Sequence, residues 1–351
     1  MDHTVGKSAK DARSLGRAMA GASPVRRYKL LLCLAAFLAF AAVPFFAPGS
    51  FVLYLLSLSV IFAIIATGLN ITNGYIGLVN LAVGGQVAFG AYSCALALLN
   101  GMPLLAALLL AVIFGIVVAA LIFLAFARLQ GFFFGLATLA ASEVIRLLIR
   151  NADRITNGTR GLRGYETLAP TPEGTYWVLL GILAVLCCGL WIIVEGPLGL
   201  QWRAIRDNRI KAAALGIPVL RLQCLGYALS GAVMSLGGAL LALHLQYIDP
   251  SIASLNTLVQ IIVMVAFGGP GTIIGPLIGA IVLTVIPELL RAANELRLII
   301  YGATLMIMVL ALPGGLIGTL QRLFRSRGNG GEGAAQDAKP LVVSPGRKDR
   351  A

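Results

Sequence analysis

The chain has 351 residues, of which 59% are hydrophobic and only 12% are charged. Soluble domains are about 45–50% apolar and about 25% charged, so this composition excludes a soluble globular protein, a disordered chain and a coiled coil. A membrane-spanning helix needs about 20 apolar residues, and the chain contains many such runs. The sequence therefore predicts an all-α, polytopic transmembrane bundle of about 8–10 spans.

The charges follow a pattern along the chain. The formal net charge is +13, from 27 lysines and arginines against 14 acidic residues, and no charged residue lies between Lys29 and Arg128. The basic residues gather in the two tails and in a central loop, which is the positive-inside pattern of membrane proteins. We therefore expect cytoplasmic termini and neighbouring anionic lipid headgroups, and no nucleic acid partner.

The first half of the chain begins with a basic tail at residues 1–29, followed by an apolar run that we interpret as an uncleaved first span. The expected spans in this half are Leu30–Ala47, Phe51–Leu69, Pro103–Ala127 and Phe132–Ile149. Residues 70–99 are glycine-rich and uncharged, with several amide side chains. This composition predicts a broken or re-entrant segment around Asn80.

The second half has two polar loops, 151–175 and 195–222. Its expected apolar segments are Tyr176–Val194, Gln223–Leu245, Leu258–Phe267, Thr272–Leu290 and Leu298–Leu312. Leu258–Phe267 is too short to cross a membrane alone and meets a glycine run at Gly268, which predicts a second break. The transmembrane domain would cover residues 30–318, and a basic tail at 319–351 is expected to be partly disordered.

An even number of segments places both termini and the 195–222 loop on the cytoplasmic side. The 151–175 loop then lies outside although it carries Arg154, Arg160 and Arg163, which is a local conflict with the positive-inside pattern. We keep this topology because both tails and the 195–222 loop agree with it.

Four polar side chains are candidates for a substrate path: Asn70, Asn80, Gln86 and Glu143. A buried amide without a partner costs about 2–7 kcal/mol, so the amides either bond between helices or line a hydrated path. Glu143 shares a helical face with Arg146 and Arg150. It either faces a polar pathway or forms an ion pair that anchors the helix end.

Two sets of small residues recur at a spacing of four and predict close helix packing. The sets are Gly231, Ser235 and Ala239, and Gly271, Gly275 and Gly279. The glycine pairs at 84–85 and 268–269 also suggest an internal repeat, in which interrupted segments of the two halves would mark a transport path.

Several chemical signatures are absent from the sequence. It contains no G-x-x-x-x-G-K-[ST] phosphate-binding loop, and no serine–histidine–aspartate or paired-carboxylate arrangement indicates catalysis. The five cysteines and two histidines show no metal-ligand spacing. We therefore expect no enzyme activity, no catalytic or metal-binding residues, and no cofactor bound by this chain.

The 195–222 loop is too long for a simple turn and has an amphipathic pattern. Apolar Trp202, Ile205 and 212–215 alternate with arginines, and Gly216 followed by Pro218 would end a short helix. Such a helix could lie on anionic lipid or dock in a protein groove, and its small apolar face favours docking. The residues that we expect to act there are Trp202, Arg203, Ile205, Arg206, Ala212, Ala213 and Gly216.

The stretch 201–208 (QWRAIRDN), continued by 211–217 (KAAALGI), resembles the cytoplasmic loop of ABC importer permeases, and in particular of LivM-type branched-chain amino acid permeases. Further motifs agree in order over residues 50–320. They are GLN at 68–70, GY at 74–75, GAY at 90–92, TLA at 138–140, NG at 157–158, GGPG at 268–271, GP at 275–276, PELLR at 287–291 and LPGGL at 312–316.

The resemblance implies a permease subunit of a bacterial inner-membrane importer. Its partners would be a second homologous permease, two cytoplasmic ATPase subunits that bind ATP and magnesium, and a periplasmic substrate-binding protein. The 195–222 loop would couple ATP hydrolysis to transport of amino acids, by default branched-chain ones. Two alternatives remain open on the sequence: a stand-alone secondary transporter with Glu143 as its ion carrier, and a channel or structural membrane protein.

Overall fold

The computed structural model describes residues 50–289. The predicted spans Leu30–Ala47 and Leu298–Leu312 and both basic tails lie outside these residues. The main helices are α3 (Ser50–Asn70), α4 (Val83–Leu99), α5 (Leu104–Phe126), α6 (Gly131–Asn151), α8 (Pro172–Glu195), α9 (Pro197–Asp207), α10 (Arg209–Ala214), α11 (Val219–Leu245), α12 (Leu255–Gly268) and α13 (Ile274–Leu289).

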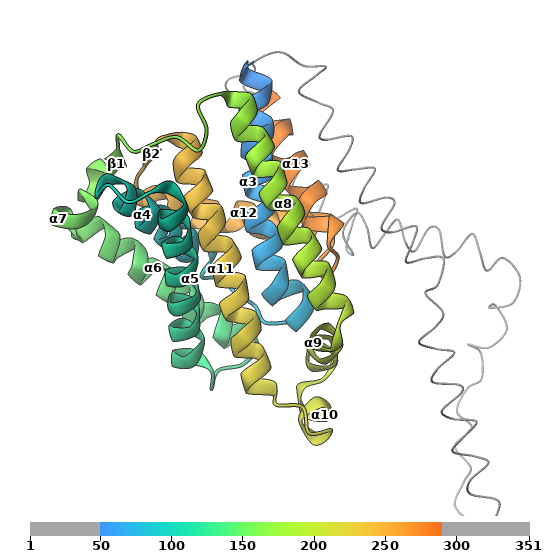
Figure 1. Cartoon of the computed structure of the whole chain (residues 1–351). Coiled ribbons are helices and arrows are strands. Elements are labelled where there is room, and N and C mark those ends of the chain that lie inside the picture. The colour runs from blue at the N-terminus through green and yellow to red at the C-terminus, as the bar shows by residue number, and fades with distance from the viewer. Residues whose placement is uncertain (1–49, 290–351) are drawn as a thin grey trace, which may run out of the picture.

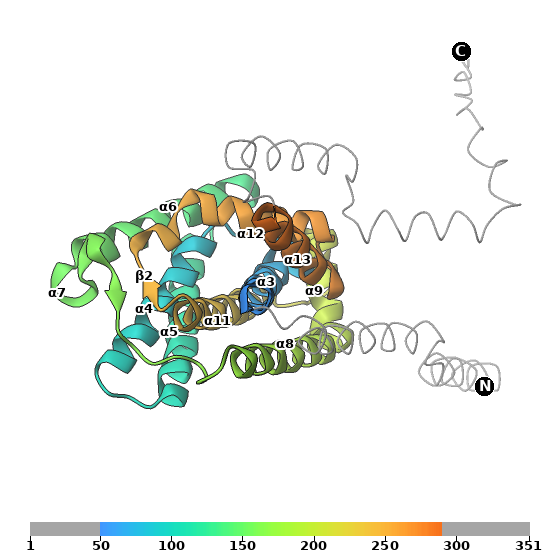
Figure 2. The same ribbon diagram turned by 90° about the horizontal axis from the view of Figure 1, so that it is seen from above.

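The described residues form an all-α membrane bundle, as the composition predicts. Among them, five helices are long and apolar enough to cross a membrane, and three apolar helices are shorter. Helices α3 and α11 pack together at the centre, with α4 and α5 on one side and α8, α12 and α13 on the other (Figures 1 and 2). Helix α6 packs on the outer side of α4.

Both expected helix breaks are present. Helix α3 runs into a π-helix, η1 (Ile71–Ile76), which ends at Gly77 with a φ of 77°. Residues 77–82 are then non-helical, and we call them the first break. The second break is 269–273, between α12 and α13. Glycines at 84–85 lie in the first turn of α4, whereas the pair at 268–269 ends α12, so these pairs give an internal repeat no support.

Small residues let α11 and α5 approach closely. A Cβ atom on Gly231 would overlap Ala119, and one on Gly115 would overlap the Ser235 side chain. The Ser235 hydroxyl donates to the Ala111 carbonyl at 2.8 Å. Ala239, one turn further along α11, is fully buried among alanines of α4 and α5. This face of α11 therefore packs by backbone proximity and one interhelical hydrogen bond.

The glycines around the second break differ in part from the expected stripe. Gly271 was expected on a helix face, but it precedes α13 and adopts a φ of 81°, a left-handed conformation that favours glycine. Gly275 and Gly279 do lie on α13. A Cβ on Gly279 would overlap the Met264 carbonyl of α12, so these two glycines allow α12 and α13 to meet.

The polar segment 152–171 is more ordered than its sequence indicates. It contains α7 (Asp153–Thr156), the 3₁₀ turn η2 (Gly158–Arg160) and β1 (Leu162–Arg163). Strand β1 pairs antiparallel with β2 (Tyr247–Ile248), which a further 3₁₀ turn, η3 (Pro250–Ala253), follows. The Tyr165 hydroxyl donates to the Ala242 carbonyl at 3.1 Å, and burial raises the pKa of this tyrosine, which keeps it a neutral donor.

This segment and the 195–222 loop lie at opposite ends of the bundle, with β1 and β2 near the top of Figure 1 and α9 and α10 at the bottom. The relative placement agrees with the predicted topology. Which end faces the cytoplasm stays a prediction.

The packing of α5 on α11 predicts a stability difference between two glycine variants. Gly115→Ala forces the Cβ against Ser235 and should lower the free energy of unfolding by about 1–3 kcal/mol, as overpacking does. Gly181→Ala on α8 meets no described atom within 4 Å and should be neutral or slightly stabilising. Thermal unfolding in detergent compares the two, and equal melting temperatures would contradict this account of the α5–α11 contact.

Candidate functional site

Helix α9 is anchored to the membrane-spanning helices by Trp202. This side chain is fully buried, and its indole Nε1 donates to the Leu222 carbonyl near the start of α11 at 3.1 Å. Ile205, one turn further along, is also buried. The apolar face predicted from the sequence therefore packs against this chain's own bundle.

The arginines of α9 bind backbone carbonyls of two other elements. Arg203 donates from Nη2 to the Val194 carbonyl at the end of α8, at 2.9 Å, and from Nε to Gly199 at 3.2 Å. A cation at a helix C-terminus also meets the negative end of the helix dipole. Arg206 donates from Nη1 to the Gly74 carbonyl of η1. Trp202, Arg203 and Arg206 thus fasten α9 to three separate elements.

The loop contains two helices where the sequence predicts one. Asn208 has extended backbone angles (φ −161°, ψ 106°) and ends α9, and its side chain accepts from Lys211 N at 2.9 Å to cap α10. Ala212 is buried, whereas Ala213 and Gly216 are exposed. Gly216 follows α10 with a φ of 80° and has no described atom near its Cβ position.

The outer surface of this loop is apolar. Ile210 is 82% exposed and Leu215 is 80% exposed, both from α10 and its end. Leu200 of α9 is 66% exposed. Exposed apolar side chains that are rimmed by polar residues are typical of surfaces that contact another protein or a membrane.

Asn70, the last residue of α3, bonds the end of that helix to the second break. Its Nδ2 donates to the Thr272 carbonyl and its Oδ1 accepts from Gly271 N, both at 2.8 Å. The side chain is fully buried. Of the two roles that the sequence leaves open for this amide, the structure shows the bond between separate segments.

Asn80 organises the first break. Its Oδ1 accepts from Ala82 N and from the Tyr227 hydroxyl of α11, both at 2.9 Å, and its Nδ2 donates to Gln86 at 3.4 Å. The Nε2 atom of Gln86 is buried without a partner among the described residues. In this conformation Asn80 and Gln86 do not line the pocket between the breaks, and their role in a substrate path stays a prediction.

Two hydroxyl groups of α6 accept hydrogen bonds from backbone N–H groups in and just after the first break. We did not choose either residue as a site candidate from the sequence. Thr138 Oγ1 accepts from Leu81 N at 3.0 Å, and Ser142 Oγ accepts from Gly85 N at 2.7 Å. Their spacing of four places them on one face of α6. That spacing is the signal that could have identified them, since serine and threonine commonly bond across membrane helices.

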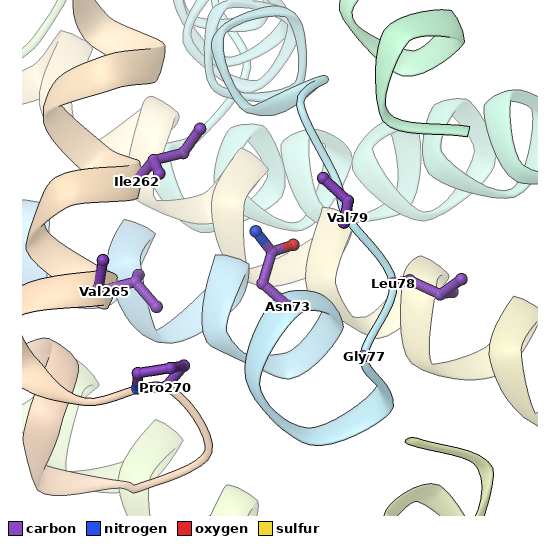
Figure 3. Close-up of a pocket in the computed structure, with 8 residues that line it drawn as sticks. Asn73, Gly77, Leu78, Val79, Ile262, Val265 and Pro270 are labelled. Atoms are coloured by element: carbon purple, nitrogen blue, oxygen red, sulfur yellow. The ribbon is translucent and has the colours of Figure 1, made fainter. Parts of the chain in front are cut away.

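An open pocket of about 270 Å³ lies between the two breaks. Its walls are apolar except for one amide, that of Asn73, which Figure 3 shows between Ile262 and Val79. The lining residues are Asn73, Gly77, Leu78, Val79, Ile262, Val265, Ala266 and Pro270. Asn73 Oδ1 accepts from Asn80 N at 2.9 Å. The Nδ2 donor of Asn73 has no partner among the described residues. The candidates chosen from the sequence in this region were Asn70, Asn80 and Gln86, and Asn73 was not among them.

Glu143 lies away from this pocket. Its carboxylate accepts from Arg146 Nε at 3.0 and 2.9 Å, in an ion pair within α6. The Glu143 side chain is 44% accessible. The structure therefore shows the ion pair and gives no contact between Glu143 and the pocket.

Comparison with known proteins shows which family model and which permeases this chain matches. The sequence model of the family described as "Branched-chain amino acid transport system / permease component" matches residues 51–309. The chain is 28% identical to the high-affinity branched-chain amino acid permease LivM of Salmonella typhimurium LT2, over 74% of this chain and 68% of that protein. LivM of Escherichia coli K12 is 27% identical over the same shares.

More distant similarity extends to permeases for other substrates. The ribose import permease RbsC of Bacillus subtilis 168 is 31% identical over 50% of this chain and 58% of that protein. No solved structure matches the chain at a comparable level of significance.

The Asn80 contacts predict that two amide substitutions differ in their effect on stability. Asn80→Leu leaves the Tyr227 hydroxyl and Ala82 N buried without their acceptor, which should cost about 1–3 kcal/mol for each group. Gln86→Leu removes a side chain that already has an unpartnered Nε2 and should cost less. Melting temperatures of the two purified variants test this, and a Gln86→Leu variant that is the less stable one would contradict it.

Proposed function

Because the chain belongs to the family of branched-chain amino acid transport permeases, we propose that it is the membrane-spanning subunit of an ABC importer for amino acids with branched apolar side chains. The observation that carries this proposal is the pocket between the two breaks. Its apolar walls suit a branched side chain, and the free Asn73 Nδ2 donor suits a carboxylate.

We propose that the energy comes from two ATPase subunits that dock on the 195–222 loop. The chain has no phosphate-binding loop of its own. The exposed Ile210 and Leu215 offer an apolar contact at the end of the bundle that carries most of the basic loop residues. A second permease subunit and a periplasmic binding protein would complete the complex in the bacterial inner membrane, with both termini of this chain in the cytoplasm.

The ion-coupled alternative depends on Glu143. An ion carrier needs a carboxylate that exchanges its cation within the transport path. Glu143 instead holds Arg146 and does not reach the pocket. This arrangement favours the ABC importer over a stand-alone secondary transporter.

Reconstitution distinguishes these functions. Proteoliposomes that contain this chain, a second permease and the ATPase subunits should take up leucine only when ATP and the binding protein are present. Ribose should not compete if the substrate class is correct. Leucine uptake by this chain alone under an ion gradient would instead establish a secondary transporter, and ATP-driven uptake of ribose would overturn the substrate assignment.

A matched pair of glycine variants tests the docking role of the loop. Gly216 and Gly164 have φ values of 80° and 86° with no described atom near either Cβ position, so a tryptophan should strain both backbones by about 1–2 kcal/mol. Because Gly216 follows α10 and Gly164 lies at the opposite end, only Gly216→Trp should reduce capture of the ATPase subunits. Capture is measured by affinity pull-down at matched membrane levels. Equal capture by both variants would argue against docking on this loop.

A further inference from the structure

The π-helix η1, which leads into the first break, touches the second break close to α9. A Cβ atom on Gly74 would overlap Asn70 Oδ1 and the backbone nitrogen of Gly271, so the η1 backbone lies directly against the second break. Asn70 closes this contact by bonding both Gly271 N and the Thr272 carbonyl. Helix η1, which leads into the first break, is therefore joined to the second break at one point, so a shift of either backbone would displace the other.

Arg206 reaches the same point from the 195–222 loop. Its Nη1 donates to the Gly74 carbonyl, and a Cβ atom on Gly271 would lie 2.5 Å from that same nitrogen. A Cβ on Gly77 would lie 2.9 Å from Arg206 Cγ, so the aliphatic stem covers the end of η1. The guanidinium and the stem thus contact both breaks at once.

These contacts lie beside the pocket walls. Asn73 and Gly77 flank Gly74 on the η1 side, and Pro270 precedes Gly271 on the other. A shift of η1 relative to the second break therefore changes the width of the pocket. Both segments are suited to such a shift, because π-helical turns and glycine-rich breaks absorb backbone rotation more easily than regular helix.

From this geometry we propose that Arg206 is the positioning residue that transmits movement of the 195–222 loop to the pocket. The inference rests on the proposed importer function and assigns one side chain to its coupling step. Trp202 and Arg203 hold α9 to the ends of α11 and α8, which are regular helices. Arg206 holds it to the breaks. A displacement of α9 by the ATPase subunits then moves η1 through the guanidinium and alters the pocket.

The test compares Arg206→Gln with Arg209→Gln in the reconstituted importer. Both variants remove one positive charge from the loop, but the Arg209 side chain makes no hydrogen bond among the described residues. Arg206→Gln should leave ATPase capture and ATP hydrolysis near wild-type levels and reduce leucine uptake per ATP hydrolysed by about tenfold or more, the ratio expected for losing a charged hydrogen bond. Arg206→Lys, which keeps one donor, should recover part of the uptake.

Gly271→Ala tests the Arg206 contact from the side of the second break. Its Cβ would displace the guanidinium, and Gly101→Ala is the matched control because Gly101 has a φ of 78° and no described atom within 4 Å. Gly271→Ala should lower uptake per ATP and Gly101→Ala should not.

Three outcomes would overturn the assignment. Unchanged uptake per ATP in Arg206→Gln would exclude a transmitting role. Loss of ATPase capture in that variant would make Arg206 a docking residue. Equal effects of Arg206→Gln and Arg209→Gln would mean that the positive charge of the loop matters and that the specific contact of Arg206 does not. Failure of the wild-type chain to capture ATPase subunits at all would instead refute the proposed function, so the two failures are distinguishable.

Discussion

The structure of this protein depends on hydrogen-bond partners for the backbone groups at two interruptions of helix inside a membrane bundle. Backbone N–H and C=O groups that leave a helix in hydrocarbon have no water to bind, so other parts of the protein must supply their partners. At the first break, Thr138 and Ser142 of α6 accept from Leu81 N and Gly85 N. At the second, Asn70 binds a donor and an acceptor together. These bonds tie α6 to the first break and the start of α4, and the end of α3 to the second break.

Close packing of α5 against α11 positions one of the residues that bond to the first break. The α5–α11 contact relies on Gly115, Gly231 and Ala119, whose missing or small side chains bring two backbones together. Tyr227 of α11 then reaches Asn80, so the same helix that packs on α5 also holds the first break. The bundle therefore combines a closely packed α5–α11 pair with two interruptions of regular helix.

Within residues 50–289 the sequence predicts the apolar helices and both breaks, because these depend on local properties. Apolar run length determines a span, and glycines such as Gly268 mark where helix ends. Other features depend on partners far along the chain and leave no local pattern. Asn70 bonds Gly271 across 201 positions, and Asn73 shares a pocket with Ile262 and Val265 of α12. The pairing of β1 with β2 and the division of the 195–222 loop at Asn208 were missed for related reasons, since short polar segments take their structure from tertiary contacts and a single cap.

The two helices of the 195–222 loop differ in how they contact the bundle, which suits the separate docking and transmitting roles that we propose for them. Helix α10 carries the exposed Ile210 and has few contacts with the bundle, so a partner can bind it without disturbing the membrane helices. Helix α9 is buried on one face and bonded by three side chains to three elements. Arginine suits this second task, because its rigid planar fork keeps several donors in fixed positions while remaining charged. In the coupling that we propose, a push on α10 would reach the membrane helices through α9, and Arg206 would pass it to η1 and the adjoining breaks.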